Sequence, residues 1–127
     1  MNAWRAYLAV GLGCGLGSAL RYQVGLWLPF PWATLVVNVL GAWLIAAFAA
    51  YAARRTHGRV ARWQPFLVAG FCGGFTTFSL FGLETLGMMH QGRHAAALGY
   101  VAVSLAAWLG AAWVGHLAGR RLAAARG

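Results

Sequence analysis

The chain has 127 residues, of which 61% are hydrophobic and only 9% are charged. A typical soluble domain carries about 25% charged residues, and a domain of this size buries only about 60–70% of its unfolded surface. The composition therefore excludes a water-soluble monomer, and the high hydrophobicity excludes an intrinsically disordered chain. The length excludes a two-domain enzyme. A small integral membrane protein remains.

The charge is strongly one-sided. The ten basic residues are all arginines, Glu84 is the single acid, and the formal net charge is +9. Such a basic chain raises the question of nucleic-acid binding. However, the arginines flank apolar segments, where arginine anchors a chain to lipid headgroups and sets its topology. We therefore expect a lipid bilayer as partner and no nucleic acid.

The pattern of apolar residues predicts an all-α membrane protein with four transmembrane helices in one domain, 1–127. A spanning helix needs about 20 mostly apolar residues. The first segment, 4–28, is the weakest because Arg5 and Arg21 interrupt it. Segments 32–53 and 95–119 contain no charged residue, and segment 65–89 contains only Glu84. Cys14 and Cys72 lie alone in apolar stretches and are expected to be small buried hydrophobes.

The predicted connections are short, and they divide the arginines unequally. Two prolines mark the first connection, 29–31, and the others are 54–62 and 90–94. Four spans place both termini and 54–62 on one side of the membrane. The other side would hold two arginines, Arg21 and Arg93. The side with the termini would hold eight, so by the positive-inside rule it faces the cytoplasm. These eight are Arg5, Arg54, Arg55, Arg59, Arg62, Arg120, Arg121 and Arg126.

Glycine contributes 18 residues, many of them grouped within the predicted spans. Small residues let membrane helices approach closely. A four-helix unit of this size has little interior of its own, so we expect it to form oligomers. The grouped glycines are Gly11, Gly13, Gly15, Gly17, Gly70, Gly73, Gly74, Gly110 and Gly115.

The run Gly-Phe-Cys-Gly-Gly-Phe-Thr-Thr-Phe-Ser-Leu-Phe-Gly-Leu-Glu, residues 70–84, lies in the middle of the third span. Paired glycines followed by aromatic and β-branched residues are poor helix formers. The run therefore predicts a helix broken at its centre, which would free backbone groups at membrane depth. Broken helices of this kind mark ion and substrate sites. The alternative is an unbroken helix whose glycines serve close packing.

Aromatic and polar residues near this run could face an ion. Phe71, Phe75, Phe78 and Phe81 would share one face if the helix continued. Such a stripe usually serves packing, but the electropositive ring edges can also face an anion.

The second span carries Thr34, Asn38 and Gly41 on one face. Asn38 could either replace part of an anion's hydration shell or bond to another helix. Tyr100 and Ser104, one turn apart on the fourth span, could continue a polar file or bond back to their own helix.

The ionisable residues well inside the predicted spans are Arg21 and Glu84, and intramembrane charges are functional candidates by default. Arg21 is near a span end and could instead extend its charge to the interface. The chain has no Asp and one Glu, so it lacks the residues for carboxylate chemistry. It also has no phosphate-binding loop. We therefore expect no enzyme activity.

These residues together resemble the CrcB/Fluc family of fluoride channels. Residues 70–84 look like the family's signature. Gly-Ser-Ala-Leu-Arg-Tyr (17–22), Thr-Leu-Val-Val-Asn-Val-Leu-Gly (34–41) and the four-span length agree with it. The resemblance implies a multi-pass protein of the cell's inner (plasma) membrane. It also implies an antiparallel, dual-topology dimer with two pores, through which cytoplasmic fluoride leaves passively and the cell is protected from fluoride toxicity.

The resemblance also implies residue roles. Phe78, Phe81 and Asn38 match the pore phenylalanines and the pore asparagine, and Thr34 matches a pore-lining hydroxyl. Tyr100 and Ser104 match the polar track of the fourth span. Gly73 and Thr76 match residues whose backbone carbonyls, with those of the second subunit, hold a structural Na⁺ at the dimer centre. Arg21 matches the vestibule arginine, and Glu84 matches the glutamate of the third span.

Two features depart from the family pattern. Trp108 stands one turn past Ser104, where family members can carry a second serine. The eight-to-two arginine distribution also favours a single orientation, whereas an antiparallel homodimer needs both. A homodimer is the favoured interpretation, and a heterodimer with an oppositely biased partner is the alternative.

Two other functions stay open at this stage. A proton-coupled small-molecule exporter of similar size would carry a glutamate in its first span, and residues 4–28 contain no acid. A non-transporting membrane scaffold would tolerate substitution of Asn38, Phe78 and Phe81 except through effects on folding.

Overall fold

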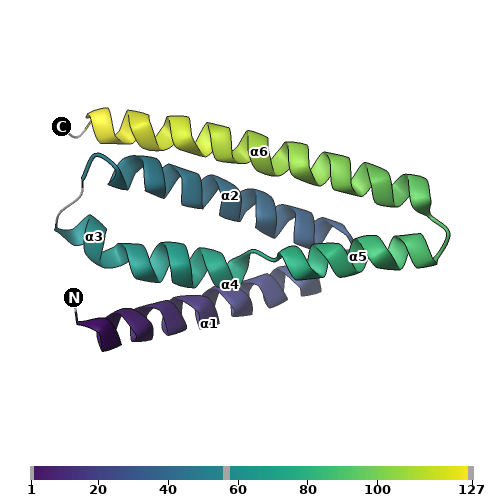
Figure 1. Ribbon diagram of the computed structural model, residues 1–127, viewed down its shortest axis with the longest axis horizontal. Coiled ribbons are helices and arrows are strands. Elements are labelled where there is room, and N and C mark those ends of the chain that lie inside the picture. Colours follow the sequence, from purple (N-terminus) through teal and green to yellow (C-terminus); the bar gives the residue numbers. More distant parts are fainter. Residues whose placement is uncertain (1, 56–57, 126–127) are drawn as a thin grey trace.

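The computed structural model describes residues 2–55 and 58–125, and this part of the chain is all helical, without strands (Figure 1). The first, second and fourth predicted spans are uninterrupted helices, whereas the third, 65–89, is built from three consecutive pieces and is preceded by a further short helix. The helices are α1 (Ala3–Trp27), α2 (Trp32–Ala52), α3 (Arg59–Gln64), the π-helix η1 (Pro65–Cys72), α4 (Gly73–Phe75), α5 (Phe78–His90) and α6 (His94–Ala125).

The connection between α2 and α3 differs from the prediction of 54–62, because helix begins again at Arg59. Gly58 precedes it with a φ of 84°, a conformation that glycine adopts without strain. Thr56 and His57 of the predicted connection lie outside the described residues. At Pro65, which has no N–H to continue the α-helical hydrogen bonds, the segment widens into η1.

Three helical segments of the described chain are long and apolar enough to cross a membrane: Trp32–Ala52, Arg59–His90 and His94–Ala125. The helix α1 has 25 residues, about 38 Å at 1.5 Å per residue, but its two arginines make it less apolar. That α1 is a membrane span, and where the exact membrane boundaries lie, stay predictions. Both termini and α3 lie at one end of the molecule, as the sequence predicts (Figure 1). That end carries the large majority of the described arginines.

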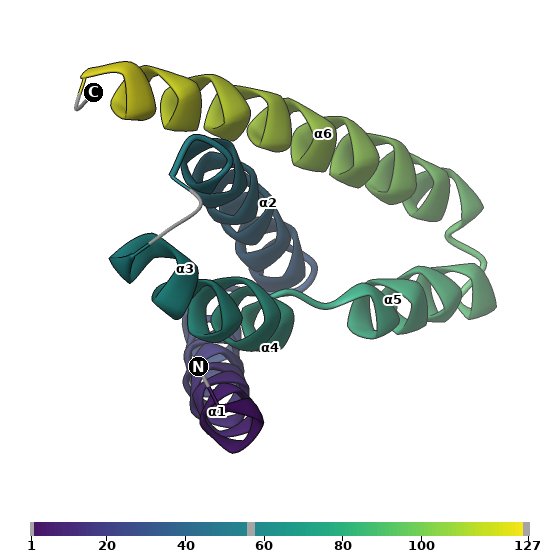
Figure 2. The same ribbon diagram turned by 60° about the vertical axis from the view of Figure 1, so that its left-hand side comes forward.

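Two helix pairs build most of the fold (Figures 1 and 2). The longest contact is between α2 and α6, and the second is between α1 and the η1–α4 segment. Beyond the break, α5 packs mainly on α6 rather than on α1. The third predicted span therefore joins the two pairs, with one half on each.

Glycines allow the closest backbone approaches, as predicted for some of them. A Cβ on Gly17 would collide with the backbone of Phe71 and Phe75, and one on Gly115 with the backbone of Trp43. Gly11, Gly15, Gly73 and Gly110, by contrast, face open space. Five of the nine grouped glycines thus serve packing inside the chain, and four leave surface that a neighbour can approach.

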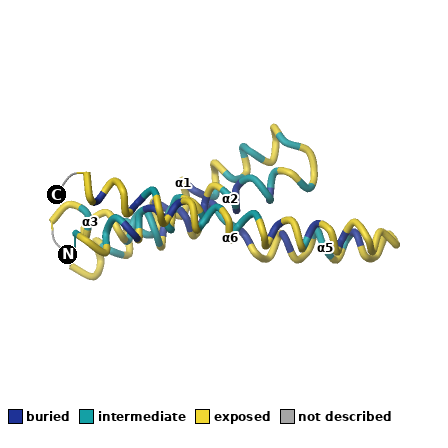
Figure 3. The backbone as a smooth tube through the Cα atoms, turned by 90° about the horizontal axis from the view of Figure 1, so that it is seen from above, coloured by how far each residue is buried: buried dark blue, intermediate teal, exposed yellow. Residues whose placement is uncertain are grey.

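Exposed residues occur along all the long helices (Figure 3), and many of them carry large apolar side chains. Leu12, Leu109 and Trp113 are each about two-thirds exposed or more. A surface of this kind suits lipid or another subunit rather than water. It agrees with a multi-pass membrane protein.

Candidate functional site

The third predicted span is broken at its centre, which confirms the prediction from residues 70–84. Thr76 and Thr77 adopt extended conformations, with φ and ψ of −86° and 159° for Thr76 and of −152° and 122° for Thr77. The Thr77 side chain caps α5 by accepting a hydrogen bond of 3.1 Å from the Leu80 N–H. A β-branched residue in an extended conformation and a Thr N-cap are both locally favourable, so the sequence itself encodes the break.

Asn38 holds the break in place from α2. Its Nδ2 donates to the Thr77 carbonyl and its Oδ1 accepts from the Thr77 N–H, each at 2.8 Å. Asn38 is only 7% exposed, so these bonds prevent the cost of burying unpaired amide groups. Of the two roles that the sequence left open, the structure shows the interhelical bond. The amide has a second N–H, and the residue lines an open pocket.

Two side chains of α1 satisfy a further carbonyl near the break. Ser18 Oγ donates to the Gly74 carbonyl at 3.3 Å, and Arg21 Nε donates to the same oxygen at 3.1 Å. A cation at the C-terminal end of a helix also interacts favourably with the helix dipole. Arg21 thus has an internal partner and does more than extend its charge to the interface.

The carbonyls of Gly73 and Thr76, expected to hold a structural Na⁺, lose their usual partners at the break. In a continuous helix they would accept from the amides of Thr77 and Leu80. Those amides donate instead to Asn38 Oδ1 and Thr77 Oγ1. No group of three or more His, Cys, Asp or Glu gathers as a metal site in residues 2–55 and 58–125. The freed carbonyls therefore fit a hard, oxygen-seeking cation.

Glu84 lies between two hydroxyl donors. Thr34 Oγ1 donates to Glu84 Oε1 at 2.7 Å, and the Tyr100 hydroxyl donates to Oε2 at 2.6 Å. The three residues come from α2, α5 and α6, so the single acid of the chain ties these helices together. Thr34 and Tyr100 therefore both use their hydroxyl hydrogen in a bond to Glu84 in this structure.

The break also divides the phenylalanine stripe into two pairs. Phe71 stacks on Phe75 at 5.5 Å between ring centroids, and Phe78 lies 5.6 Å from Phe81. Phe78 is 73% exposed, whereas Phe81 is 5% exposed. Phe81 contacts Tyr100 at 5.2 Å and meets Trp108 edge to face at 4.8 Å.

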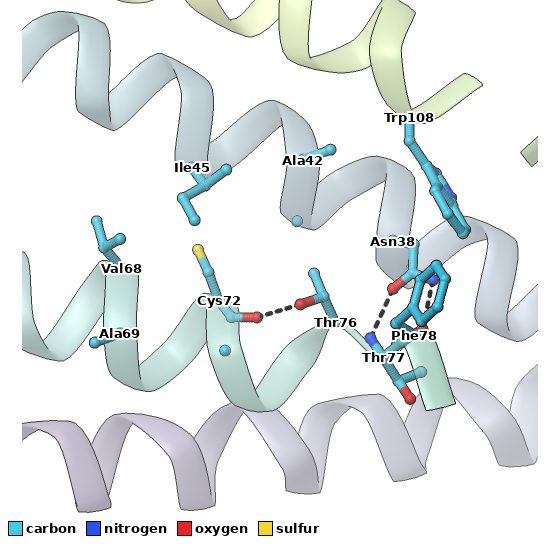
Figure 4. Close-up of a pocket in the computed structure, with 12 residues that line it drawn as sticks. Asn38, Ala42, Ile45, Val68, Ala69, Cys72, Thr76, Thr77, Phe78 and Trp108 are labelled. Carbon is cyan, nitrogen blue, oxygen red and sulfur yellow. Dashed lines mark hydrogen bonds between the residues drawn. The ribbon is translucent and has the colours of Figure 1, made fainter. Parts of the chain in front are cut away.

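The predicted site residues gather in three neighbouring places. Asn38, Gly73, Thr76 and Phe78 line an open pocket of about 380 Å³ between α2 and the broken helix (Figure 4). Arg21, Thr34 and Glu84 line a smaller one of about 170 Å³. Of the remaining three, Phe81 and Tyr100 are buried where α5 meets α6. Ser104 is buried on α6, one turn beyond Tyr100.

Sequence reasoning missed Thr77, Ser18 and Trp108 as parts of the site. Thr77 carries the bonds to Asn38, and Trp108 lines the larger pocket. Ser18 lies three residues before Arg21, and this spacing places both on one helix face. That spacing, and the position of Thr77 directly before the new helix, were the signals available in the sequence.

Comparison with known proteins identifies the family. Residues 8–116 match the family described as CrcB-like protein, Camphor Resistance (CrcB). The chain is 42% identical to the "Fluoride-specific ion channel FluC 1" of Rhodopseudomonas palustris (strain BisB18), over 91% of this chain and 87% of that protein. It is 46% identical to the "Fluoride-specific ion channel FluC" of Bordetella petrii, over 78% and 79%, and 42% identical to that of Paramagnetospirillum magneticum, over 88% and 93%. The chain therefore belongs to the CrcB family.

Proposed function

We propose that this protein is a passive, fluoride-selective channel that exports cytoplasmic fluoride and so protects the cell from its toxicity. Relatives at 42–46% identity carry the name fluoride-specific ion channel. The observation on the molecule itself that carries the proposal is the broken helix, with Asn38 and Phe78 beside it in one pocket. A negative-inside potential drives an anion outward without a further energy source.

The site offers donors that suit a small anion. The second N–H of Asn38 can replace a water molecule of its hydration shell. The ring edges of Phe78 and Phe81 are electropositive. The Ser104 hydroxyl continues this set of donors on α6. Thr34 and Tyr100 would serve fluoride only by leaving Glu84, to which they donate here.

The protein acts in this proposal as an antiparallel dimer with a structural Na⁺ at its centre. Gly73 is exposed, and both Gly73 and Thr76 line the open pocket. Their carbonyls, together with those of a second copy, would hold the cation. The ion would neutralise the partial negative charge of four inward-facing carbonyls and so stabilise the dimer.

The arginine distribution bears on the orientation. Positive residues concentrate at one end of the molecule, which by the positive-inside rule faces the cytoplasm of the inner membrane. We favour a homodimer in which half of the copies insert against this tendency. A heterodimer with an oppositely biased partner is the alternative.

Fluoride efflux from liposomes that contain the purified protein tests the proposal. A fluoride electrode should record rapid release, while chloride release measured alongside stays at the level of empty liposomes. Absence of fluoride release would point first to a missing oppositely oriented partner, which co-expression with such a chain would supply. If co-expression also fails, the protein is a membrane scaffold and the proposal is wrong.

A further inference from the structure

Two buried hydrogen-bonding groups on α6 have no partner. They are the Ser104 hydroxyl and the Trp108 indole N–H, and no other buried side-chain nitrogen or oxygen in the described residues is unpaired. Ser104 is completely buried. An unpaired buried group costs about 1–3 kcal/mol, so a pair of them on adjacent turns needs an explanation.

The two groups lie on one face of α6, the face on which Tyr100 and Trp108 contact the ring of Phe81. Tyr100, Ser104 and Trp108 follow one another at intervals of four residues, which places them on successive turns of the same face. Phe81 contacts the first and the third, at 5.2 Å and 4.8 Å between ring centroids. Ser104 lies on the turn between these two contacts.

Trp108 also connects this place with the open pocket. It lines the pocket together with Asn38 and Phe78, and Figure 4 shows its side chain reaching from α6 toward these two residues. The unpaired donors thus lie where the pocket meets the buried aromatic cluster of Phe81 and Tyr100.

The chemistry of the two groups defines the ligand. An indole N–H can only donate a hydrogen bond, so whatever binds it must be an acceptor. No acceptor among the described residues pairs with either group, and both oxygens of the single carboxylate, Glu84, already accept from Thr34 and Tyr100. Because Ser104 is completely buried, the ligand must be small and must reach the hydroxyl without its hydration shell.

We propose that Trp108 N–H and Ser104 O–H form a binding position for a dehydrated fluoride ion between Phe81 and α6. This inference rests on the proposed function and adds a residue to it. Trp108 occupies the position where a second serine was expected, and its indole supplies the donor that the missing hydroxyl would give. The edge-to-face contact between Trp108 and Phe81 fixes the direction of that donor.

Nuclear magnetic resonance of the wild-type protein tests the binding position directly. Indole N–H signals are recorded for protein labelled with nitrogen-15 at tryptophan in detergent micelles, and the Trp108→Phe variant assigns the Trp108 signal. Sodium fluoride should shift this signal downfield with saturation, while sodium chloride and sodium gluconate leave it in place. A signal that ignores fluoride, or that moves equally in all three salts, means that the group binds only water, and the proposal fails.

Liposome efflux separates this inference from the proposed function. Trp108→Phe keeps an aromatic ring but removes the N–H, and we expect it to lower fluoride efflux about tenfold, the effect of losing about 1.4 kcal/mol. Trp113→Phe is the matched control, because Trp113 lies on the same helix and is 66% exposed. It should conduct as the wild type does.

The possible outcomes are distinct. If the wild type conducts and Trp108→Phe conducts equally, the inference is wrong and the proposed function stands. If neither the wild type alone nor its co-expressed pair conducts, the proposed function itself is wrong. Ser104→Ala gives a second, smaller substitution at the same position and should also lower efflux.

Discussion

The two halves of the broken helix are packed in different ways. On the η1–α4 side, backbone lies against backbone: Cβ atoms on Gly70 or Gly74 would collide with main-chain atoms of Val10 and Cys14 in α1. On the α5 side, side chains make the contact, through a cluster of Phe81, Met88, Ala97 and Tyr100.

The two sides of the break also differ in how fully their polar groups are hydrogen-bonded. Near the end of α4 the Gly74 carbonyl has two donors, whereas the α6 face opposite α5 keeps two donors without an acceptor. We expect the η1–α4 side to act as a support that holds the break in place. We expect the α5–α6 side, with its two unpaired donors, to act as the recognition side.

Gly74→Ala should have the largest effect, because it disrupts the backbone packing between α4 and α1. The added Cβ would lie about 2.9 Å from main-chain carbon atoms of Cys14 and closer still to its carbonyl oxygen. The clash could be relieved only by moving one helix backbone away from the other. We expect a loss of stability of about 3 kcal/mol, at the upper end for overpacking, measured by thermal unfolding in detergent. Gly15→Ala, where the added group meets open space, is the control. Equal stability of the two variants would contradict backbone packing on this side.

Asn38→Asp tests the residue that joins both sides. The carboxylate cannot donate to the Thr77 carbonyl and places negative charge beside a permeating anion. We expect fluoride efflux to fall about 100-fold, equivalent to about 2.7 kcal/mol, while gel filtration still shows a dimer. Wild-type efflux from this variant would mean that Asn38 does not line the pathway.

Phe81→Ile probes the recognition side alone. Isoleucine keeps much of the volume but removes the electropositive ring edge, so we expect efflux to fall about tenfold or more without loss of the folded dimer. Phe66→Ile is a matched control, because Phe66 lies in η1 and packs on Trp63 of α3, on the other side of the break from α5. Similar efflux from both variants would argue against a role for the Phe81 ring in conduction.

Ser18→Ala should have the smallest effect. Arg21 still donates to the Gly74 carbonyl, so the loss of stability should stay below about 1 kcal/mol. Removing both donors, in Ser18→Ala combined with Arg21→Gln, leaves the carbonyl unsatisfied and should cost more than the sum of the single changes. Strict additivity in thermal unfolding would show that the two donors act independently.

The sequence predicted a larger share of the helices than of the contacts between them. The break was foreseeable from Gly73-Gly74 and Thr76-Thr77, because local conformational preference acts within a few residues. The start of α3 at Arg59 was not foreseen, because an arginine-rich stretch is typical of both a loop and a helix end. For Asn38, the sequence left two partners open, and the structure shows the one that depends on the position of a different helix.

By itself, the sequence determined an all-helical membrane protein with a broken third segment and its arginines gathered at one end. Hydropathy, helix propensity and charge order are local properties, and each can be read along the chain. Tertiary structure alone decided that Glu84 accepts hydrogen bonds from Thr34 and Tyr100. It also decided that Gly17 but not Gly15 packs against a neighbouring helix, and that the side-chain donors of Ser104 and Trp108 have no partner. These outcomes depend on the rotation and register of packed helices. The rotation and the register of each helix result from the packing of many side chains at once, so no single stretch of sequence specifies them.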